Sequence, residues 1–320
     1  MDCDELSKSG FDLEESGPMM RKEVLTKRGP WPRGEETHTP TLTLFAVPKA
    51  FEGHTGVIQR NAIRSWAALM PYVEVLLFGS PEDSELQAMA DEVDARVIPL
   101  TENNQGTPIL DQVFAQAHAY SRATCMGYVN CDIIMGPALL DAVNGLTESE
   151  LTSYLAIGQR TDLQVDKEIS FENKIAVSQL NTQREQQGHL DSVVCKDYFL
   201  FSKDLFRTIP KFLVGRGNWD NWMVASTKSS GVPVVDVTEV LTAIHQRHPH
   251  SHVTGGRKNA YVFGEEAREN QRLAGGRHLI KGSTATWFLT SEGLKKRTFP
   301  LISMIRDIPK FASLLANLMR

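Results

Sequence analysis

The sequence has few cysteines, no long apolar run and no excess of basic residues, and each of these absences excludes a class of protein. Only four of its 320 residues are cysteines, and no two of them form a Cys-x-x-Cys pair. A disulfide framework is therefore not expected, and the pattern fits buried thiols in a reducing compartment. No run approaches the roughly 18–20 apolar residues that a membrane-spanning helix needs.

The charge balance excludes a further class. The formal net charge is −5 at pH 7, so the chain lacks the broad positive surface with which nucleic-acid-binding proteins contact phosphates. The first stretch, MDCDELSKSGFDLEESG, is acidic, whereas a secretory signal peptide starts basic and continues apolar. We therefore expect a cytoplasmic protein without a nucleic-acid partner.

What the sequence does contain is an alternation of strand-like and helix-like segments. Residues 1–40 lack hydrophobic periodicity and end in the Gly/Pro-rich KRGPWPRGEETHTP, which predicts a disordered tail. From residue 41, amphipathic segments separate four apolar runs, namely TLTLFAV, VEVLLFG, ARVIPL and CMGYVNCDIIM. This order predicts an α/β domain over residues 41–262, with a mixed, mainly parallel sheet and helices on both faces.

The later part of the chain is less regular. The strand candidates SYLAIGQRTDL, VVCKDYFLFS and VPVVDVT are separated by long polar segments, which are usually functional or mobile. Residues 263–320 are predicted to form a helical extension, which is basic and amphipathic near its end. It could make a peripheral contact with an anionic membrane surface, or pack against the domain or a second subunit.

A carboxylate interrupts the fourth apolar run, in GYVNCDIIM. Ligands of parallel α/β sheets bind outside the carboxyl ends of the strands, and Asp132 comes near such an end. Mg²⁺ and Mn²⁺ prefer oxygen ligands and share them with substrate phosphates. On the residues alone, Asp132 could equally cap the helix that follows.

This arrangement resembles the GT-A (Rossmann-like) fold of nucleotide-sugar-dependent glycosyltransferases, in which a hydrophobic strand ends in an Asp-x-Asp motif. The corresponding residues here are Asn130-Cys131-Asp132, with an amide in place of the first acid. The resemblance implies that Asp132 holds Mn²⁺ or Mg²⁺ together with the diphosphate. Asn130 could bind the ribose, but it is a weaker cation ligand than an acid.

The same resemblance implies an activity of the hexosyltransferase type (EC 2.4) in glycan or glycoconjugate synthesis. The donor would be a nucleoside diphosphate sugar, with a UDP-sugar favoured, and the acceptor a hydroxyl group of a glycan or a lipid-linked molecule. Two alternatives stay open. A sugar nucleotidyltransferase would share the fold, and a non-catalytic module that binds nucleotide sugars or carbohydrates could keep the fold without the first acid.

Two stretches fit the donor and metal sites of GT-A enzymes. The turn VPKAFEGHTG follows the first strand, where the base and ribose bind, so Pro48, Lys49 and Phe51 are candidate wall residues, unless the turn is an ordinary loop. GT-A enzymes often complete the metal site with a histidine after a late strand. His245 and His248 in AIHQRHPHSH stand where such a ligand would come from, with an exposed loop as the alternative.

A third stretch, FLVGRGNWDNWM, fits an acceptor site. Trp219 and Trp222 could stack on a sugar ring, and Asp220 could serve as the general base that an inverting transferase needs. Asp197 is the competing carboxylate. The stretch could instead be a helix start, with Asn218 as N-cap and the tryptophans as buried anchors.

Several basic residues could offset the charge of a diphosphate leaving group. Arg160, Arg216, Arg257 and Lys258 are the candidates, because a fixed guanidinium grips phosphate oxygens in pairs. Arg257 and Lys258 follow two glycines in TGGRKN, which would let a loop close over the nucleotide. A solvated surface position is the alternative for each of them.

Overall fold

The computed structural model describes residues 39–103, 105–192, 195–248, 259–276 and 285–297. The predicted tail, apart from residues 39 and 40, lies outside these ranges, as does the amphipathic stretch 298–320. Within the described ranges we find no helix with the length and hydrophobicity needed to cross a bilayer.

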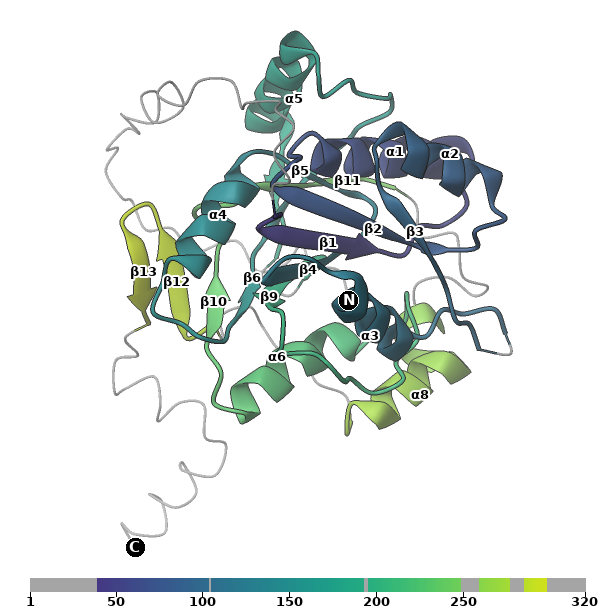
Figure 1. The fold of residues 1–320 in the computed structure, drawn as a ribbon, viewed down its shortest axis with the longest axis vertical. Coiled ribbons are helices and arrows are strands. Elements are labelled where there is room, and N and C mark those ends of the chain that lie inside the picture. Colours follow the sequence, from purple (N-terminus) through teal and green to yellow (C-terminus); the bar gives the residue numbers. More distant parts are fainter. Residues whose placement is uncertain (1–38, 104, 193–194, 249–258, 277–284, 298–320) are drawn as a thin grey trace, which may run out of the picture. The chain divides into compact units, whose positions relative to one another are not determined.

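The described chain alternates strands and helices, as Figure 1 shows. The strands are β1 (Leu42–Ala46), β2 (Val73–Gly79), β3 (Arg96–Pro99), β4 (Cys125–Val129), β5 (Ile133–Met135), β6 (Leu155–Ile157), β7 (Arg160–Leu163), β8 (His189–Leu190), β9 (Tyr198–Ser202), β10 (Val234–Asp236), β11 (Ala243–Gln246), β12 (Trp287–Thr290) and β13 (Gly293–Lys296). The helices are α1 (Gly53–Ala67), α2 (Ser84–Glu92), α3 (Leu110–Tyr120), α4 (Ala138–Thr147), α5 (Lys174–Gln187), α6 (Trp219–Ser229), the π-helical turn η2 (Asn259–Phe263) and α8 (Glu265–Leu273).

The main sheet is mixed and mostly parallel, which confirms the predicted class. Its nine strands run in the order β13-β12-β10-β6-β9-β4-β1-β2-β3. β1 pairs in parallel with β2 and β4, whereas β9 runs antiparallel between β4 and β6. The carboxyl ends of β1 and β4 therefore meet at one edge of the sheet, where ligands of such folds bind.

Helices cover both faces of this sheet (Figure 1). Side chains of α1, α2 and α4 form one buried core with β1 and β4, and it includes the fully buried Trp66. Side chains of α3 and α6 form a second core on the opposite face, where Phe45 meets Phe114 edge to face, with ring centroids 5.0 Å apart. Burying each such side chain contributes about 1.5–3 kcal/mol, so both faces hold the strands in place.

A second sheet of four strands, in the order β5-β11-β7-β8, lies beyond the end of β4. The predicted strand CMGYVNCDIIM is therefore wrong as a single element, because the chain leaves the main sheet at Val129 and enters the small sheet at Ile133. The candidate SYLAIGQRTDL divides in the same way, into β6 and β7. Apolar side chains of the small sheet pack with Leu180 of α5.

Two further segments differ from expectation. The polar stretch before His189 contains α5, which begins where the Asn173 side chain accepts hydrogen bonds from two backbone N–H groups. Within residues 263–320, expected to be helical, α8 is followed by β12 and β13. These strands continue the main sheet because β12 pairs in parallel with β10 and buries Leu289 beside α4.

Candidate functional site

Asp132 lies in the turn between β4 and β5, where the two sheets meet. The Asn130 N–H donates to the carbonyl of Asp197 (2.9 Å), and the Ile133 N–H donates to the carbonyl of Asn130 (3.1 Å), so residues 130–133 form a β-turn. The indole of Trp66 donates to the Ile133 carbonyl (2.9 Å) and fixes the far side of the turn. Asp132 is thus near the end of a strand, as predicted, but in a turn. It does not cap α4, whose N-cap position is held by Pro137.

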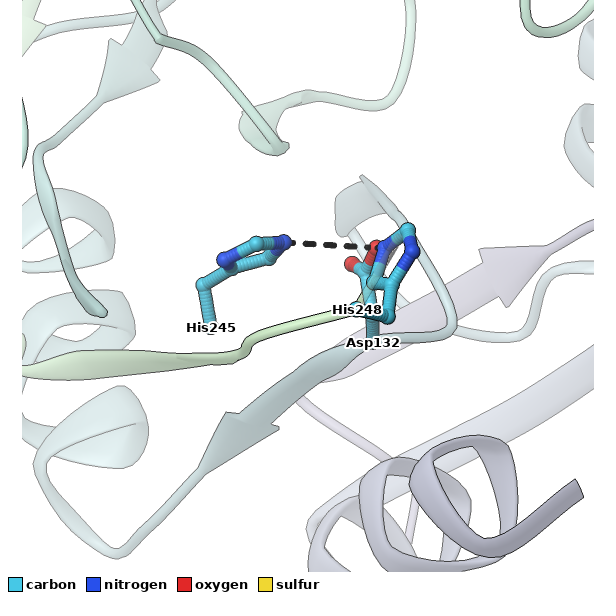
Figure 2. A group of neighbouring side chains, drawn as sticks. All are labelled: Asp132, His245 and His248. Atoms are coloured by element: carbon cyan, nitrogen blue, oxygen red, sulfur yellow. Dashed lines mark hydrogen bonds and ion pairs between the residues drawn. The ribbon is translucent and has the colours of Figure 1, made fainter. Parts of the chain in front are cut away.

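β11 and the residues just after it bring two histidines to this turn, His245 in the strand and His248 beyond its end. The strand pairs antiparallel with β5, with His245 opposite Ile133, and the Gln246 N–H donates to the Asp132 carbonyl (3.0 Å). Figure 2 shows the imidazoles gathered at the Asp132 carboxylate. Oδ2 of Asp132 lies 2.9 Å from Nε2 of His248 and 3.6 Å from Nε2 of His245.

These three side chains fit a divalent cation. Each offers one ligand atom, and the three atoms lie within 4.8 Å of one another. Oδ1 of Asp132 is buried and has no hydrogen-bond partner among the described residues, which is costly for a carboxylate oxygen unless a ligand occupies it. One carboxylate with two imidazoles is a donor set that suits Mn²⁺ and other first-row divalent ions.

The electrostatics of the trio follow from burial and charge. Burial alone would raise the pKa of the Asp132 carboxyl, but hydrogen bonds and charge interactions with His245 and His248 outweigh it and lower that pKa. Burial lowers the pKa of His245, and the Asp132 carboxylate more than compensates, so the net shift is upward. The site therefore keeps Asp132 ionised, which a metal ligand requires.

Behind His245 lies a second layer of charged residues. Nδ1 of His245 donates to Oδ1 of Asp162 (2.9 Å), which leaves Nε2 facing Asp132. The Arg160 guanidinium, largely buried, pairs with Asp162 (3.2 Å), Asp191 (3.0 Å) and Asp197. Three carboxylates therefore engage the Arg160 guanidinium, and its predicted contact with a diphosphate stays a prediction.

The three residues predicted to wall the donor site lie between β1 and α1, in different surroundings. Phe51 is only 6% exposed and packs in the core with Arg60 over its ring, so its side chain does not form an open wall. Pro48 is partly exposed. Lys49 is exposed as a residue, but burial around its ammonium group lowers the pKa of Lys49, and the negative charge of Asp132 opposes the shift.

An open pocket of about 260 Å³ adjoins the trio, and its lining includes His248. The other lining residues are His54, Gln164, Asp166 and Arg247. Sequence reasoning missed His54 and Arg247, although His54 stands in the quoted turn VPKAFEGHTG and Arg247 between the two predicted histidines. Arg247 is exposed and adds a positive charge to the pocket that His248 lines.

The predicted acceptor residues stand at the start of α6. Trp219 is 7% exposed and packs against Tyr128 and Phe199, with ring centroids 5.1 Å and 5.4 Å away. This placement favours the buried-anchor interpretation of Trp219. Trp222 is partly exposed and meets Phe212 at 5.3 Å, so part of its surface stays open.

Asp220 is in the first turn of α6, where the helix dipole favours a negative charge. Asn218 holds the N-cap position with a left-handed backbone (φ 80°), but its side chain makes no capping hydrogen bond. Burial raises the pKa of Asp220, while Lys196 opposes the shift and Asp197 adds to it. Because Lys196 and Asp197 directly precede β9, the start of α6 lies near the motif turn.

Of the other basic candidates, the structure describes only Arg216, and it is engaged away from the trio. Arg216 pairs with Glu266 at 2.5 Å, which ties the loop before α6 to α8. Arg257 and Lys258 lie outside the described ranges, so their predicted contact with the nucleotide stays a prediction.

The fold is similar to that of solved glycosyltransferases. A fragment of TarS from S. aureus in complex with UDP-GlcNAc matches with a TM-score of 0.50 and 13% identity, over 73% of this chain and 65% of that fragment. Glucosyl-3-phosphoglycerate synthase from Mycobacterium tuberculosis, in complex with Mg²⁺ and uridine diphosphate, matches with a TM-score of 0.43 and 14% identity, over 75% and 81% of the two chains.

At these identities the similarity shows the fold alone. The chain has an α/β fold of the GT-A type, with a mixed, mostly parallel sheet. No protein-family model matches the sequence, and a search of curated proteins finds no match.

Proposed function

We propose that this protein transfers a sugar from a nucleoside diphosphate sugar to a hydroxyl acceptor. The observation that carries the proposal is the meeting of Asp132, His245 and His248 at the end of β4, on a sheet of the GT-A type. The site lies where such sheets bind ligands, and its donor set suits a cation that also binds phosphates. The TarS fragment is bound to UDP-GlcNAc, which supports a UDP-sugar as the donor.

In this proposal the trio holds Mn²⁺ or Mg²⁺, and the cation offsets the negative charge of the diphosphate. Lys49, whose ammonium group lies near Asp132, adds positive charge on the β1 side. Arg247 adds it in the pocket beside His248, and Arg257 with Lys258 could add more. Asn130 and Pro48 border the nucleoside.

Asp220 is the proposed general base. Its raised pKa suits a group that must take up a proton. Its carboxylate would accept the proton of the acceptor hydroxyl while the acceptor oxygen attacks the anomeric carbon, and the bond from that carbon to the diphosphate would break. Direct attack of this kind inverts the anomeric centre. Trp222, partly exposed in the same helix, is the remaining aromatic candidate for contact with the acceptor.

Calorimetric titration with UDP, with and without Mn²⁺, tests the proposal. We expect UDP binding that depends on Mn²⁺ and is weakened more than about 100-fold in Asp132→Asn, because that variant loses a ligand rather than a supporting residue. Asp204→Asn, at an exposed position beside Arg207, is the matched control and should bind as the wild type does. Failure of the wild type to bind UDP under either condition would refute the donor assignment.

A further inference from the structure

Asn130, which stands where GT-A enzymes have an acid, faces an acid on the neighbouring strand. β4 and β9 are antiparallel, with Val129 opposite Tyr198, and the ladder continues one residue further where the Asn130 N–H donates to the Asp197 carbonyl (2.9 Å). Nδ2 of Asn130 also donates to Oδ1 of Asp197 at 2.9 Å. The amide and the acid are thus joined at backbone and side chain.

The chemistry of the two groups fixes their orientation. A carboxylate only accepts hydrogen bonds, so the Asn130 atom that faces Asp197 is the NH₂ group, and the planar amide directs its carbonyl oxygen away from Asp197. The second oxygen of Asp197, Oδ2, pairs with the Arg160 guanidinium. Burial raises the pKa of Asp197 as it raises that of Asp220, so the pKa does not distinguish them. Both oxygens of Asp197 are engaged by Asn130 and Arg160, which favours Asp220 as the base.

We propose that Asp197, just before β9, takes the role of the missing first acid of the motif, while the Asn130 amide occupies the place of that acid at the end of β4. Asp197 is then a positioning residue. It supplies negative charge near Asp132 and turns the Asn130 carbonyl oxygen toward the nucleotide, while Arg160 holds Asp197 in place. This inference rests on the proposed function, because the position of the first acid matters only at a nucleotide-sugar site.

The proposal predicts that putting an acid back at position 130 is harmful unless Asp197 is changed as well. Asn130→Asp would set two carboxylates face to face without a donor between them. Asp197→Asn alone can be accommodated, because the Asn130 amide can flip and accept from the new NH₂ group. With both substitutions, the amide at 197 accepts from Arg160 and donates to the acid at 130, so every hydrogen bond is remade with the positions exchanged.

Thermal unfolding of the metal-free protein tests the pairing. We expect Asn130→Asp to lower the unfolding midpoint by about 3–8 °C, because it leaves two buried oxygens unsatisfied. The same substitution in an Asp197→Asn background should change the midpoint by less than about 1 °C. Asp191→Asn is the matched control background, because Asp191 also pairs with Arg160 but does not hydrogen-bond to Asn130. There, Asn130→Asp should be as damaging as in the wild type.

Titration with Mn²⁺ and UDP separates this inference from the proposed function. The doubly substituted chain has the same charge and the same hydrogen-bonding groups as the wild type, so it should bind both ligands more tightly than Asn130→Asp alone. The proposal is overturned if Asn130→Asp is as stable as the wild type and binds Mn²⁺ more tightly than the wild type does. It is also overturned if the effects of the two substitutions on the unfolding midpoint are additive. If the wild type binds neither ligand, the proposed function fails, and the unfolding data still decide for or against the pairing.

Discussion

Two groups of charged side chains lie on opposite sides of His245, and they differ in how the hydrogen-bonding capacity of their carboxylates is satisfied. On one side Asp132 faces two imidazoles and has one buried oxygen to which no described residue donates a hydrogen bond. On the other side three aspartates surround the Arg160 guanidinium. The first group is incomplete without a ligand, whereas the second is closed by a side chain of the protein itself.

This difference distinguishes side chains that can bind a cation from side chains that hold other residues in position. An open oxygen beside imidazole nitrogens can take up a cation, but a carboxylate already paired with a guanidinium gains little from one. His245 belongs to both groups, since Nε2 faces Asp132 and Nδ1 donates to Asp162. The closed group therefore acts on the open one through the orientation of this imidazole, as supporting residues do at metal sites.

The largest expected effect comes from opening the closed group. Arg160→Met leaves three partly buried aspartates without their common partner, so we expect the free energy of unfolding to fall by about 3–5 kcal/mol. Urea unfolding measures it. Arg207→Met, which removes an exposed arginine paired with Asp204, is the control and should change the free energy by less than about 1 kcal/mol. A similarly small loss in Arg160→Met would show that the two groups do not differ in this way.

A smaller effect is expected where the two groups join. Asp162→Ala removes the acceptor for Nδ1 of His245, so the imidazole can rotate or adopt the other tautomer, and Mn²⁺ should bind about 10–100-fold more weakly. Asp162→Asn keeps an oxygen that can accept the same hydrogen bond and should lose less. Titration with Mn²⁺ alone measures both.

Asp191→Asn is the matched control for this prediction. This variant also removes a partner of Arg160, but Asp191 does not hydrogen-bond to His245. The Mn²⁺ affinity should therefore change less than about threefold. If Asp162→Ala and Asp191→Asn weakened Mn²⁺ binding equally, the effect would come from general loss of charge rather than from His245.

The open group was predictable from the sequence, and the closed group was not. Asp132 interrupts an apolar run and the histidines follow a late strand, so both signals are local in the chain. The partners of Arg160 come from β7, the segment after β8 and the segment before β9, and only the folded chain brings them together. The chemistry of arginine alone therefore predicts that Arg160 binds phosphate, whereas in the folded chain Arg160 pairs with carboxylates.

Aromatic residues show the same limit. Phe51 and Trp219 lie in the segments where the sequence predicts them. Helix α6 begins at Trp219, which agrees with the alternative that this stretch is the start of a helix. Which face of a ring is buried depends on neighbours distant in sequence, such as Tyr128 beneath Trp219. The turn that begins at Asn130 is not predicted from the sequence either, because an apolar run on both sides of a turn resembles one long strand.

The smallest expected effect compares Asp220 with a member of the closed group. Burial raises the pKa of Asp220. For Asp191, burial also acts upward, but hydrogen bonds and the Arg160 charge outweigh it and lower the pKa. A carboxyl with a raised folded-state pKa contributes stability that is present at low pH and is lost as pH rises through that pKa, whereas a lowered pKa gives the opposite dependence.

The unfolding midpoint as a function of pH should therefore separate the two residues. As pH rises from about 4 to 8, Asp220→Asn should become more stable relative to the wild type, by on the order of 2 °C, because the variant carries no buried charge. Asp191→Asn should instead lose stability relative to the wild type at lower pH, as pH rises from about 2 to 4, because only the wild type gains the ionised pair with Arg160, and it should change little above about pH 5. The same trend in both variants would contradict the distinction. A rise for Asp220→Asn would mean that the chain keeps this carboxylate at a cost in stability, as expected of a residue retained for chemistry.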